Sequence, residues 1–402
     1  MRFAAILTAV LLAGCTATPV SPGLMQPRQP WPNPPQPAAP PEVTPELIKE
    51  ALATGVQRLL ALQEGPDKAE WPYEGVYRVN RQIPMGYRIG GTAIVVQALA
   101  HAPGYDNDQP RKDAIDRAVA FICTARADPT MSIDDYTGGY DVRGWGYIEA
   151  VQVLCRLKAL GRMPEARAKD ADEALAWYLD ALQRHEIPVV GGWNYARGPV
   201  NEKANPSPFM TVRALEALFD AKSLGLVVKE DVIARALTVL DKARGATGTV
   251  IYAGAADGRA LRRSDAVPGA VGRMASAEAV LMSAGKGRER DCRAAVEAFL
   301  VNWPWLEQRR AKTGTHEGPY AIAPYYFMFA HLYAARAVEH LDPSDRAEYR
   351  RRVREAVFLT RTEDGTWNDR VFPRSAGYGT AMAMLALMQN DIKPALWSSP
   401  GP

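Results

Sequence analysis

The chain repeats one two-helix pattern six times, and this repetition limits its possible folds more than any other feature. Each repeat begins with a charged amphipathic helix, continues through a loop rich in Gly, Arg and aromatic residues, and ends with a helix of small and apolar residues. The predicted charged helices are 46–63, 111–127, 165–185, 229–243, 290–309 and 344–360. The predicted apolar helices are 92–102, 147–160, 210–224, 275–284, 324–341 and 380–388.

The two kinds of helix differ in how much of their surface they can expose to water. The first charged helix places Val56 and Leu59 on one face and charge on the opposite face. The apolar helices, such as 93–99 and 381–387, have little polar face, and a helix that is apolar nearly all round is buried. Six buried helices inside six exposed ones form two concentric rings. The sequence therefore predicts an all-α fold, an (α/α)6 toroid, as a single domain over residues 45–402.

The amino terminus has the pattern of a bacterial export signal. Arg2 precedes an apolar run over residues 4–14, which is too short for a permanent membrane span. The end of this run and Cys15 resemble a lipobox, Leu-Leu-Ala-Gly-Cys, after which the cysteine is acylated. We expect a signal peptide over 1–14 and a membrane anchor at Cys15; a secretory signal with an incidental cysteine is the alternative. By resemblance to Gram-negative lipoproteins, Thr16 favours the outer membrane, facing the periplasm.

The segment 15–44 is dense in proline and has few aliphatic residues to bury. Such a segment stays disordered and extended, partly as polyproline II, at about 3 Å per residue. We expect it to be a tether between the lipid anchor and the toroid. The formal net charge of +3 is too small to indicate a polyanion binder, so we expect no nucleic-acid partner.

Three cysteines lie in the expected toroid: Cys123, Cys155 and Cys292. Cys123 and Cys155 fall on consecutive predicted helices and could pair in an oxidising compartment. Their apolar neighbours favour buried, inert thiols instead. The sequence contains no Cys-x-x-Cys or His-x-x-x-His spacing, so we predict neither a metal site nor a cofactor.

Loops that lead into the apolar helices share a Gly- and Trp-containing motif. The motifs are Gly144–Tyr147, Gly191–Trp193 and Gly365–Trp367. Together with the helix alternation over residues 45–390, they resemble the squalene cyclase and protein prenyltransferase β-subunit superfamily, the terpenoid cyclase superfamily. The resemblance implies the toroid, but it says little about activity because the same scaffold hosts several chemistries.

The resemblance also says which catalytic residues to look for. Squalene-hopene cyclases protonate an alkene with an Asp-x-Asp-Asp motif, and the nearest match is 132–135, Ser-Ile-Asp-Asp, which lacks the first aspartate. Asp134 would be the acid by that correspondence, with Asp135 beside it; adjacent loop aspartates are otherwise turn or capping residues. Protein prenyltransferases hold zinc with an Asp, a Cys and a His, and one residue separates the Asp from the Cys. Asp291 and Cys292 are adjacent instead, so we exclude that activity.

The loops before the six apolar helices should meet at one open end of the toroid, which we call the mouth. Helix amino termini bring partial positive charge and free N–H groups there, and five of the six loops add arginine. We predict that the mouth binds an anionic or polyhydroxylated ligand between aromatic walls, unless these side chains only pack the loops. The candidate ligand-binding residues are Arg143, Trp145, Trp193, Tyr195, Arg197, Tyr320, Tyr325, Tyr326, Trp367 and Asp369.

His316 and Glu317 lie in the loop before the fifth apolar helix, which Pro324 is suited to begin. A histidine beside a carboxylate can transfer protons near neutral pH. A histidine that is merely satisfied within the core is the alternative. The candidate catalytic residues are Asp134, Asp135, His316 and Glu317.

Three classes of function fit this pattern. The first is a cyclase-like toroid that binds an isoprenoid or other ligand at the mouth or in the lumen, with or without catalysis. The second is a glycan-active enzyme, similar to a polysaccharide lyase or hydrolase, in which Trp145, Trp193 and Trp367 stack on sugars and Asp135, Glu317 or Asp369 act as acid and base. The third is a module that holds a partner protein. The incomplete acid motif and the expected envelope location argue against cyclisation, so the sequence favours ligand binding.

Overall fold

The computed structural model describes residues 33–134, 142–195, 204–256 and 262–397, and these residues form twelve α-helices and no named strand. The outer helices are α1 (Pro45–Ala61), α3 (Gln109–Ala125), α5 (Ala168–Arg184), α7 (Glu230–Lys242), α9 (Glu289–Arg309) and α11 (Pro343–Phe358). The inner helices are α2 (Met85–His101), α4 (Arg143–Ala159), α6 (Pro208–Ser223), α8 (Val267–Ser283), α10 (Tyr326–Val338) and α12 (Ala376–Leu387).

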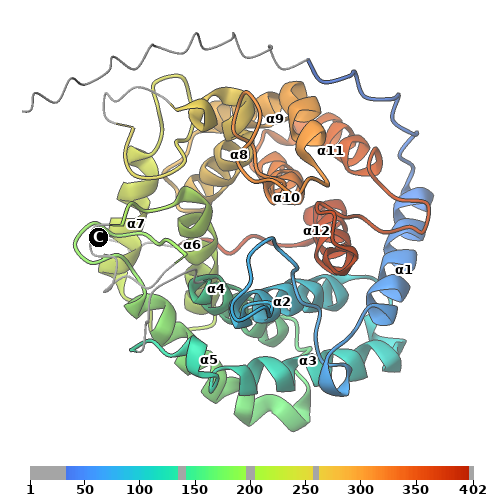
Figure 1. Ribbon diagram of the computed structural model, residues 1–402, viewed down its shortest axis with the longest axis vertical. Helices are drawn as coiled ribbons and strands as arrows, with labels where there is room; N and C mark the ends of the chain where they lie inside the picture. The colour runs from blue at the N-terminus through green and yellow to red at the C-terminus, as the bar shows by residue number, and fades with distance from the viewer. Residues whose placement is uncertain (1–32, 135–141, 196–203, 257–261, 398–402) are drawn as a thin grey trace, which may run out of the picture. The chain divides into compact units, whose positions relative to one another are not determined.

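The inner helices form a closed ring. Each contacts the next one along the chain, and α12 returns to contact α2 (Figure 1). The outer helices pack outside them, so that α3 contacts α2, α5 contacts α4 and α9 contacts α8. Their buried residues recur at helical spacing, while the inner helices are buried along nearly their whole length. The predicted (α/α)6 toroid is confirmed.

Most inner helices begin earlier than predicted, because packing overrides the low helix propensity of glycine. A Cβ at Gly90 in α2 would lie 2.4 Å from the ring of Trp145 in α4, and a Cβ at Gly86 would lie 2.2 Å from the Val142 carbonyl oxygen. The glycines therefore let α2 and α4 approach closely while both stay helical. As a consequence Arg143 and Trp145, expected in a loop, lie in the first turn of α4.

Trp71, Trp193 and Trp367 fasten the loop of their repeat to both helices. Their indole N–H groups donate to outer-helix carbonyls of Leu59, Leu182 and Val357 at 2.6, 2.9 and 2.8 Å. Their backbone N–H groups donate to the inner-helix hydroxyls of Thr92, Thr211 and Thr380 at 2.9, 3.1 and 3.1 Å. In the first and sixth repeats a glycine precedes this threonine, and a Cβ at Gly91 or Gly379 would meet the tryptophan carbonyl at 2.4 or 2.3 Å. These tryptophans are structural anchors.

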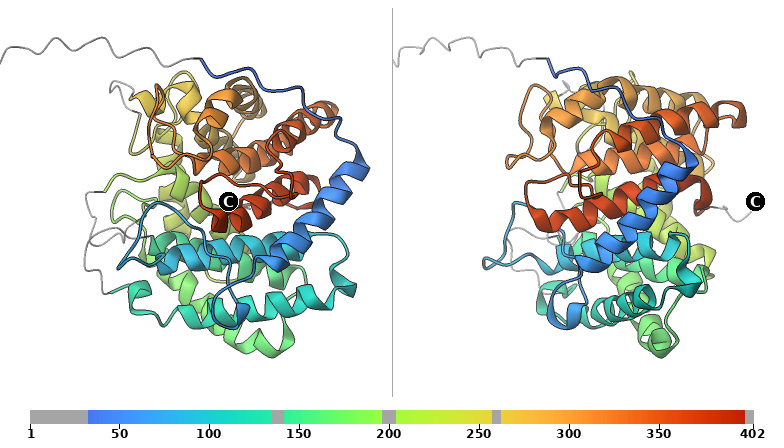
Figure 2. Two further views of the ribbon diagram at one scale, coloured as in Figure 1. Left: turned by 45° about the vertical axis from the view of Figure 1, so that its right-hand side comes forward. Right: turned by 90° about the vertical axis from the view of Figure 1, so that its right-hand side faces the viewer.

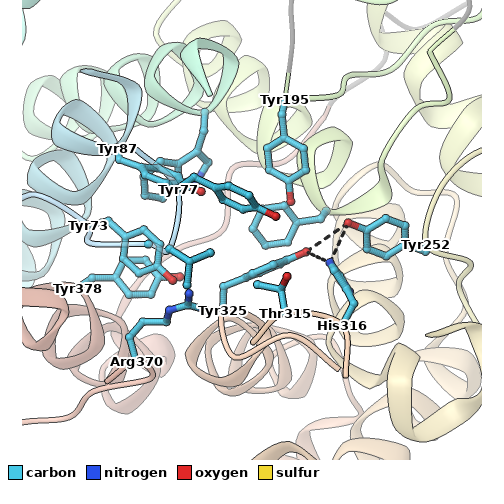
Figure 3. Close-up of a pocket in the computed structure, with 14 residues that line it drawn as sticks. Tyr73, Tyr77, Tyr87, Tyr195, Tyr252, Thr315, His316, Tyr325, Arg370 and Tyr378 are labelled. Carbon is cyan, nitrogen blue, oxygen red and sulfur yellow. Dashed lines mark hydrogen bonds between the residues drawn. The ribbon is translucent and has the colours of Figure 1, made fainter. Parts of the chain in front are cut away.

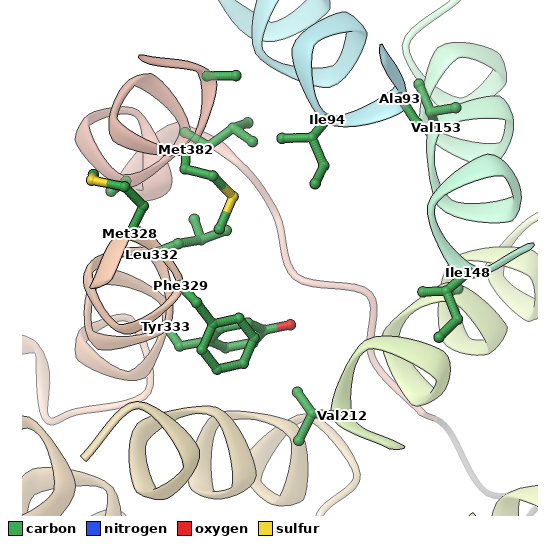
Figure 4. Close-up of a cluster of buried hydrophobic side chains, with 14 of the residues drawn as sticks. Ala93, Ile94, Ile148, Val153, Val212, Met328, Phe329, Leu332, Tyr333 and Met382 are labelled. Carbon is green, nitrogen blue, oxygen red and sulfur yellow. The ribbon is translucent and has the colours of Figure 1, made fainter. Parts of the chain in front are cut away.

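Side chains fill the lumen of the inner ring. Ile94, Val212 and Met382 point inward from three different helices and are almost fully buried (Figure 4). Phe329 and Tyr333 of α10 lie against each other with ring centroids 4.5 Å apart. The described residues therefore form a packed core at the centre of the ring.

Ion pairs cross the same interior. Arg213 of α6 donates to Glu149 of α4, with Nε 2.8 Å from Oε1, and both side chains are buried. Arg336 of α10 donates to both oxygens of Glu216 of α6 at 2.6 Å, and the Tyr333 hydroxyl also donates to Glu216. Buried charges need such partners because desolvation is costly. An isoprenoid chain would meet these charges rather than a continuous apolar tunnel.

The carboxyl-terminal segment 389–397 covers the end of the ring away from the mouth. Trp397 stacks near Phe219 with centroids 5.5 Å apart, and its backbone N–H donates to the Ser283 carbonyl at 3.0 Å. Only about 20 Å³ of space remains beside this segment. In the right-hand view of Figure 2 the loops before the inner helices gather at the opposite end. The toroid is thus open at one end.

The three cysteines are buried and unpaired, in agreement with their apolar surroundings. Burial raises the pKa of the Cys123 thiol to about 11 and that of the Cys292 thiol to about 12. Burial raises the pKa of Cys155 further. These thiols are protonated and inert at neutral pH.

Within the described part of the chain, no helix is long and apolar enough to cross a membrane.

Candidate functional site

A cavity of about 220 Å³ opens at the mouth, where the amino-terminal ends of α2, α4, α6, α10 and α12 meet (Figure 3). Its walls are mainly aromatic and include seven tyrosines. The lining residues are Tyr73, Gly75, Val76, Tyr77, Tyr87, Trp145, Tyr195, Phe209, Tyr252, Thr315, His316, Tyr325, Arg370 and Tyr378. The mouth predicted from the repeat pattern therefore contains a real pocket.

One wall is an aromatic cluster from the first, second and sixth repeats. Tyr73 meets Tyr87 edge-on at a centroid distance of 5.3 Å and lies 4.6 Å from Tyr378. Trp145 contacts Tyr87 at 5.5 Å and rests on Gly90, whose missing side chain leaves room for the indole. The close packing of α2 on α4 thus places Trp145 in the cavity wall.

The opposite wall centres on Tyr325, the residue that caps α10. Its ring lies 5.4 Å from Phe209 of α6 and 4.6 Å from Tyr326. Tyr195 approaches the same group from the loop before α6, 6.1 Å from Phe209. This wall presents aromatic faces together with tyrosine hydroxyls.

His316 joins two of these hydroxyls. Its Nδ1 lies 3.1 Å from the Ala321 carbonyl oxygen, which can only accept, so Nδ1 carries the proton. Nε2 faces the hydroxyls of Tyr252 and Tyr325 at 3.3 and 3.4 Å, and these hydroxyls lie 3.4 Å apart. The Nε2 lone pair is therefore directed at the cavity wall with two hydroxyl donors beside it (Figure 3).

The protonation states at this triangle follow from burial. Burial lowers the pKa of His316 from its usual value, so the ring is neutral at pH 7. Burial raises the pKa of Tyr252 to about 12, and it raises the pKa of Tyr325 well above the usual value. At neutral pH the imidazole nitrogen can therefore accept a proton, and the tyrosine hydroxyls beside it can donate one.

A tight turn over residues 315–322 holds His316 in place. His316 has φ of +54°, a left-handed conformation that costs about 1–3 kcal/mol outside glycine. The Nδ1 contact with Ala321 and the backbone hydrogen bond from Ile322 to Glu317, at 3.1 Å, close the turn. Strain of this kind is concentrated at functional sites, which supports a role for His316.

Arg370 reaches the cavity from the loop before α12. Its side chain is 3% exposed, and within the described residues its Nε and Nη1 have no hydrogen-bond partner. The neighbouring Asp369 is fully buried, and burial raises the pKa of its carboxyl group to about 7 despite the opposing charge of Arg370. Asp369 lies behind Tyr73 and Tyr378, whose pKa values its charge helps to raise after burial.

Four of the predicted site residues line the cavity, namely His316, Trp145, Tyr195 and Tyr325. Glu317 turns away from it: its side chain is 54% exposed and pairs with Arg309 at 3.0 Å. Glu317 is next to His316 in the sequence but points outward, because the left-handed turn at His316 reverses the chain.

Other predicted residues support the walls without facing the cavity. Arg143 donates to the Ser132 carbonyl and fixes the loop before α4. Tyr320 packs edge-on against Trp305 at 4.9 Å, and Tyr326 lies behind Tyr325.

Two of the predicted stacking tryptophans are also away from the cavity. Trp193 and Trp367 are fully buried as loop anchors, so neither presents a ring face to a ligand. A stacking role does not fit this placement.

The aspartate pair is only partly described. Asp134 is 69% exposed and pairs with Arg184 of α5 at 2.7 Å, away from the lining residues. Asp135 and Arg197 lie outside the described residues, as does Cys15. Over the described ranges, no group of three His, Cys, Asp or Glu side chains could hold a metal ion.

Sequence reasoning missed Tyr73, Tyr87, Phe209 and Arg370. Tyr87 and Phe209 fall in first turns of inner helices, close to the predicted starts, and nothing in the local pattern separates them from core residues. Tyr73 follows the anchor Trp71 by two residues, so a comparison of the anchor positions between repeats would have singled out this loop.

Neither a protein-family model nor a curated protein matches the chain, but solved structures match it over most of its length. An α-1,6-mannanase of Salegentibacter sp. HEL1_6 is similar with a TM-score of 0.53 at 12% identity, covering 85% of this chain and 99% of that one. An unsaturated glucuronyl hydrolase from Streptococcus agalactiae is similar with a TM-score of 0.57 at 12% identity, covering 88% and 94%. At these identities the likeness shows the toroid fold alone.

A type II terpene cyclase from Scytonema is also similar, at 13% identity over 86% of this chain and 99% of that one. Its TM-score of 0.47 is lower than those of the two hydrolases. Membership of the squalene cyclase superfamily stays a prediction.

Proposed function

We propose that this protein is a glycan-active enzyme that holds one sugar unit of a glycan in the tyrosine-lined cavity. The observation that carries this proposal is the wall itself, in which aromatic faces alternate with hydroxyl groups around about 220 Å³. Sugar rings have apolar C–H faces and polar edges, and tyrosine offers both complements. The volume is below the roughly 300–1,000 Å³ of pockets for drug-sized ligands, so it suits one ring rather than a long chain.

His316 is the proposed proton-transfer group. Its neutral Nε2 is an acceptor within reach of the cavity, and the two tyrosine hydroxyls beside it are donors. Proton transfer by a positioned side chain contributes typically about 10²–10⁴-fold to rate. The aspartate pair is the competing choice, because an inactive variant of the similar mannanase has two adjacent aspartates replaced. Here Asp134 faces α5 and solvent, which favours His316.

Binding of an isoprenoid in the lumen is the weaker proposal. Aliphatic and aromatic side chains fill the inner ring, and the Glu149–Arg213 and Glu216–Arg336 pairs cross it. The mannanase and the glucuronyl hydrolase, which have TM-scores above 0.5, both act on glycans according to their names. Their similarity supports the glycan proposal.

A ligand screen tests the proposed function. The purified protein is heated with neutral and acidic oligosaccharides and, separately, with isoprenoid lipids. A ligand at 100 times its Kd is expected to stabilise the protein by about 2.7 kcal/mol, so binding raises the melting temperature. We expect glycans to raise it and isoprenoids to leave it unchanged. A shift with isoprenoids alone would support the cyclase-like function, and no shift with either would favour a partner-protein module.

We further propose that acylation of Cys15 anchors the protein in the cell envelope, with the outer membrane favoured. Replacing Cys15 by serine removes the thiol that the acyl chain needs, so a full-length C15S variant should move from the membrane fraction to the soluble fraction. A parallel Cys123→Ser variant controls for general effects of cysteine loss. Membrane fractionation and lipid labelling measure both. An unchanged distribution of C15S would contradict the anchor.

A further inference from the structure

Unpartnered polar groups gather at one side of the cavity. Within the described residues, the Nε and Nη1 atoms of Arg370, both carboxyl oxygens of Asp369 and the hydroxyl of Tyr73 are buried without a hydrogen-bond partner. These three side chains are 3%, 0% and 5% exposed. Buried polar groups are nearly always hydrogen-bonded, because leaving them unpaired destabilises the fold. Arg370 and Tyr73 also line the cavity, whereas Asp369 does not, so only Arg370 and Tyr73 can be reached by a ligand bound there.

The charge of Arg370 is available to a ligand. Other buried arginines are already paired, as Arg213 is with Glu149. Arg370 forms no ion pair with any described residue, although Asp369 precedes it in the chain. Burial raises the pKa of Asp369 to about 7, which weakens this carboxyl group as a counter-charge for Arg370 near neutral pH. Arg370 therefore lines the cavity without a carboxylate partner among the described residues.

We propose that Arg370 binds the carboxylate of an acidic sugar, so that the substrate class is a uronate-containing glycan. This inference rests on the proposed function. A planar guanidinium matches a carboxylate with two parallel hydrogen bonds, and Tyr73 lines the same cavity. Arg370 and His316 lie on opposite sides of Tyr325, and all three line the cavity (Figure 3).

This orientation fits a β-elimination. Pairing with Arg370 neutralises the carboxylate and makes the proton on the adjacent C5 more acidic. Nε2 of His316 takes that proton, the C5–H electron pair forms the C4=C5 double bond, and the C4–O bond breaks. The leaving oxygen takes a proton from the Tyr325 hydroxyl. His316 then returns its proton to Tyr325 across their 3.4 Å contact, so the protein is restored and no other reactant is needed.

The test compares ligands that differ only in the carboxylate. The full protein is titrated with oligogalacturonates, with the same oligosaccharides after reduction of their carboxyl groups to alcohols, and with sulfated neutral oligosaccharides. We expect the acid form to bind at least 10-fold more tightly than the reduced form. The Arg370→Gln variant should lose this preference, since a hydrogen bond to a charged group is worth about 1.5–3 kcal/mol, or roughly 10–150-fold in Kd.

Arg374→Gln is the matched control. Arg374 lies four residues further along the same loop, but its guanidinium already pairs with Glu64 at 2.6 Å, so its loss should change the Kd less than 2-fold. Arg370→Lys keeps the positive charge but loses the planar guanidinium that donates two parallel hydrogen bonds. This variant should bind the acid form with intermediate affinity. If Arg370→Gln does not fold, two measurements still test the carboxylate subsite. They are the comparison of acid and reduced oligosaccharides on the unaltered protein and the affinity of Arg370→Lys.

Two different failures can be told apart. Equal binding of the acid and reduced forms, unchanged affinity of a folded Arg370→Gln, or binding of sulfated sugars alone would overturn the carboxylate subsite and leave a glycan-active protein. No binding of any oligosaccharide by the unaltered protein would overturn the proposed function as well. Release of a product with the ultraviolet absorbance of a conjugated double bond would support the elimination.

Discussion

Replacing His316 by glutamine should lower the turnover of a glycan substrate by about 10²–10⁴-fold while changing its affinity only a few-fold. The imidazole Nε2 is the neutral acceptor closest to the two tyrosine hydroxyls, and an amide cannot take a proton at that position. Glutamine keeps a polar group of similar reach, so the cavity should stay formed. Steady-state kinetics on the unaltered protein and on H316Q measure the loss as a change in kcat.

The proposed role of His316 also predicts how the activity changes with pH. Burial lowers the pKa of His316 from its usual value, so the active neutral form persists at pH 7 and activity falls as the pH drops through that lowered value. The pKa of Tyr252, raised to about 12, keeps its hydroxyl protonated on the alkaline side. Asp369 titrates near 7, so the profile is best taken in an Asp369→Asn background, where that carboxyl group no longer contributes to the acidic limb.

Glu317→Gln is the control for His316. Glu317 is adjacent in sequence and was an equal candidate there, but it pairs with Arg309 outside the cavity. Its replacement should leave kcat within about 3-fold. Equal losses in E317Q and H316Q would mean that the loop as a whole, rather than the imidazole, is required. Full activity of H316Q would exclude His316 as the proton-transfer group.

Replacing Trp193 by alanine should destabilise the fold by about 3–5 kcal/mol, the usual cost of deleting a large buried aromatic side chain. The indole is fully buried and ties the end of α5 to the start of α6 through Leu182 and Thr211. Denaturant unfolding at equilibrium measures the change in the free energy of unfolding. The cavity should persist in the fraction that stays folded.

Trp193→Phe separates the anchor from a sugar-stacking role. Phenylalanine keeps most of the buried area but removes the indole donor to the Leu182 carbonyl, which still accepts from the His185 backbone N–H at 3.2 Å, so the loss should cost about 0.5–1.5 kcal/mol. A folded W193F should therefore bind glycans as the unaltered protein does. Loss of binding in W193F with normal stability would show that this tryptophan contacts the ligand and that its buried placement does not hold in solution.

The sequence located His316 and Tyr325 because His316 lies in the loop before the predicted helix 324–341 and Tyr325 in its first turn, so both were expected at the mouth. It could not separate Trp145 from Trp193, since both follow glycine before an apolar helix. The two differ only in three dimensions: Trp145 lies over Gly90 and faces the cavity, whereas Trp193 points back to α5. Loop side chains are directed by neighbouring repeats, which are distant in sequence.

The six-fold alternation of apolar and charged helices was enough to determine the double ring, because a helix without a polar face must be buried and its charged partner must cover it. Which aromatic residues form the pocket, and that Arg370 lies unpaired at its edge, was decided only by tertiary structure. Those features depend on close glycine contacts and on the left-handed turn at His316, and no periodic pattern in the sequence records either one.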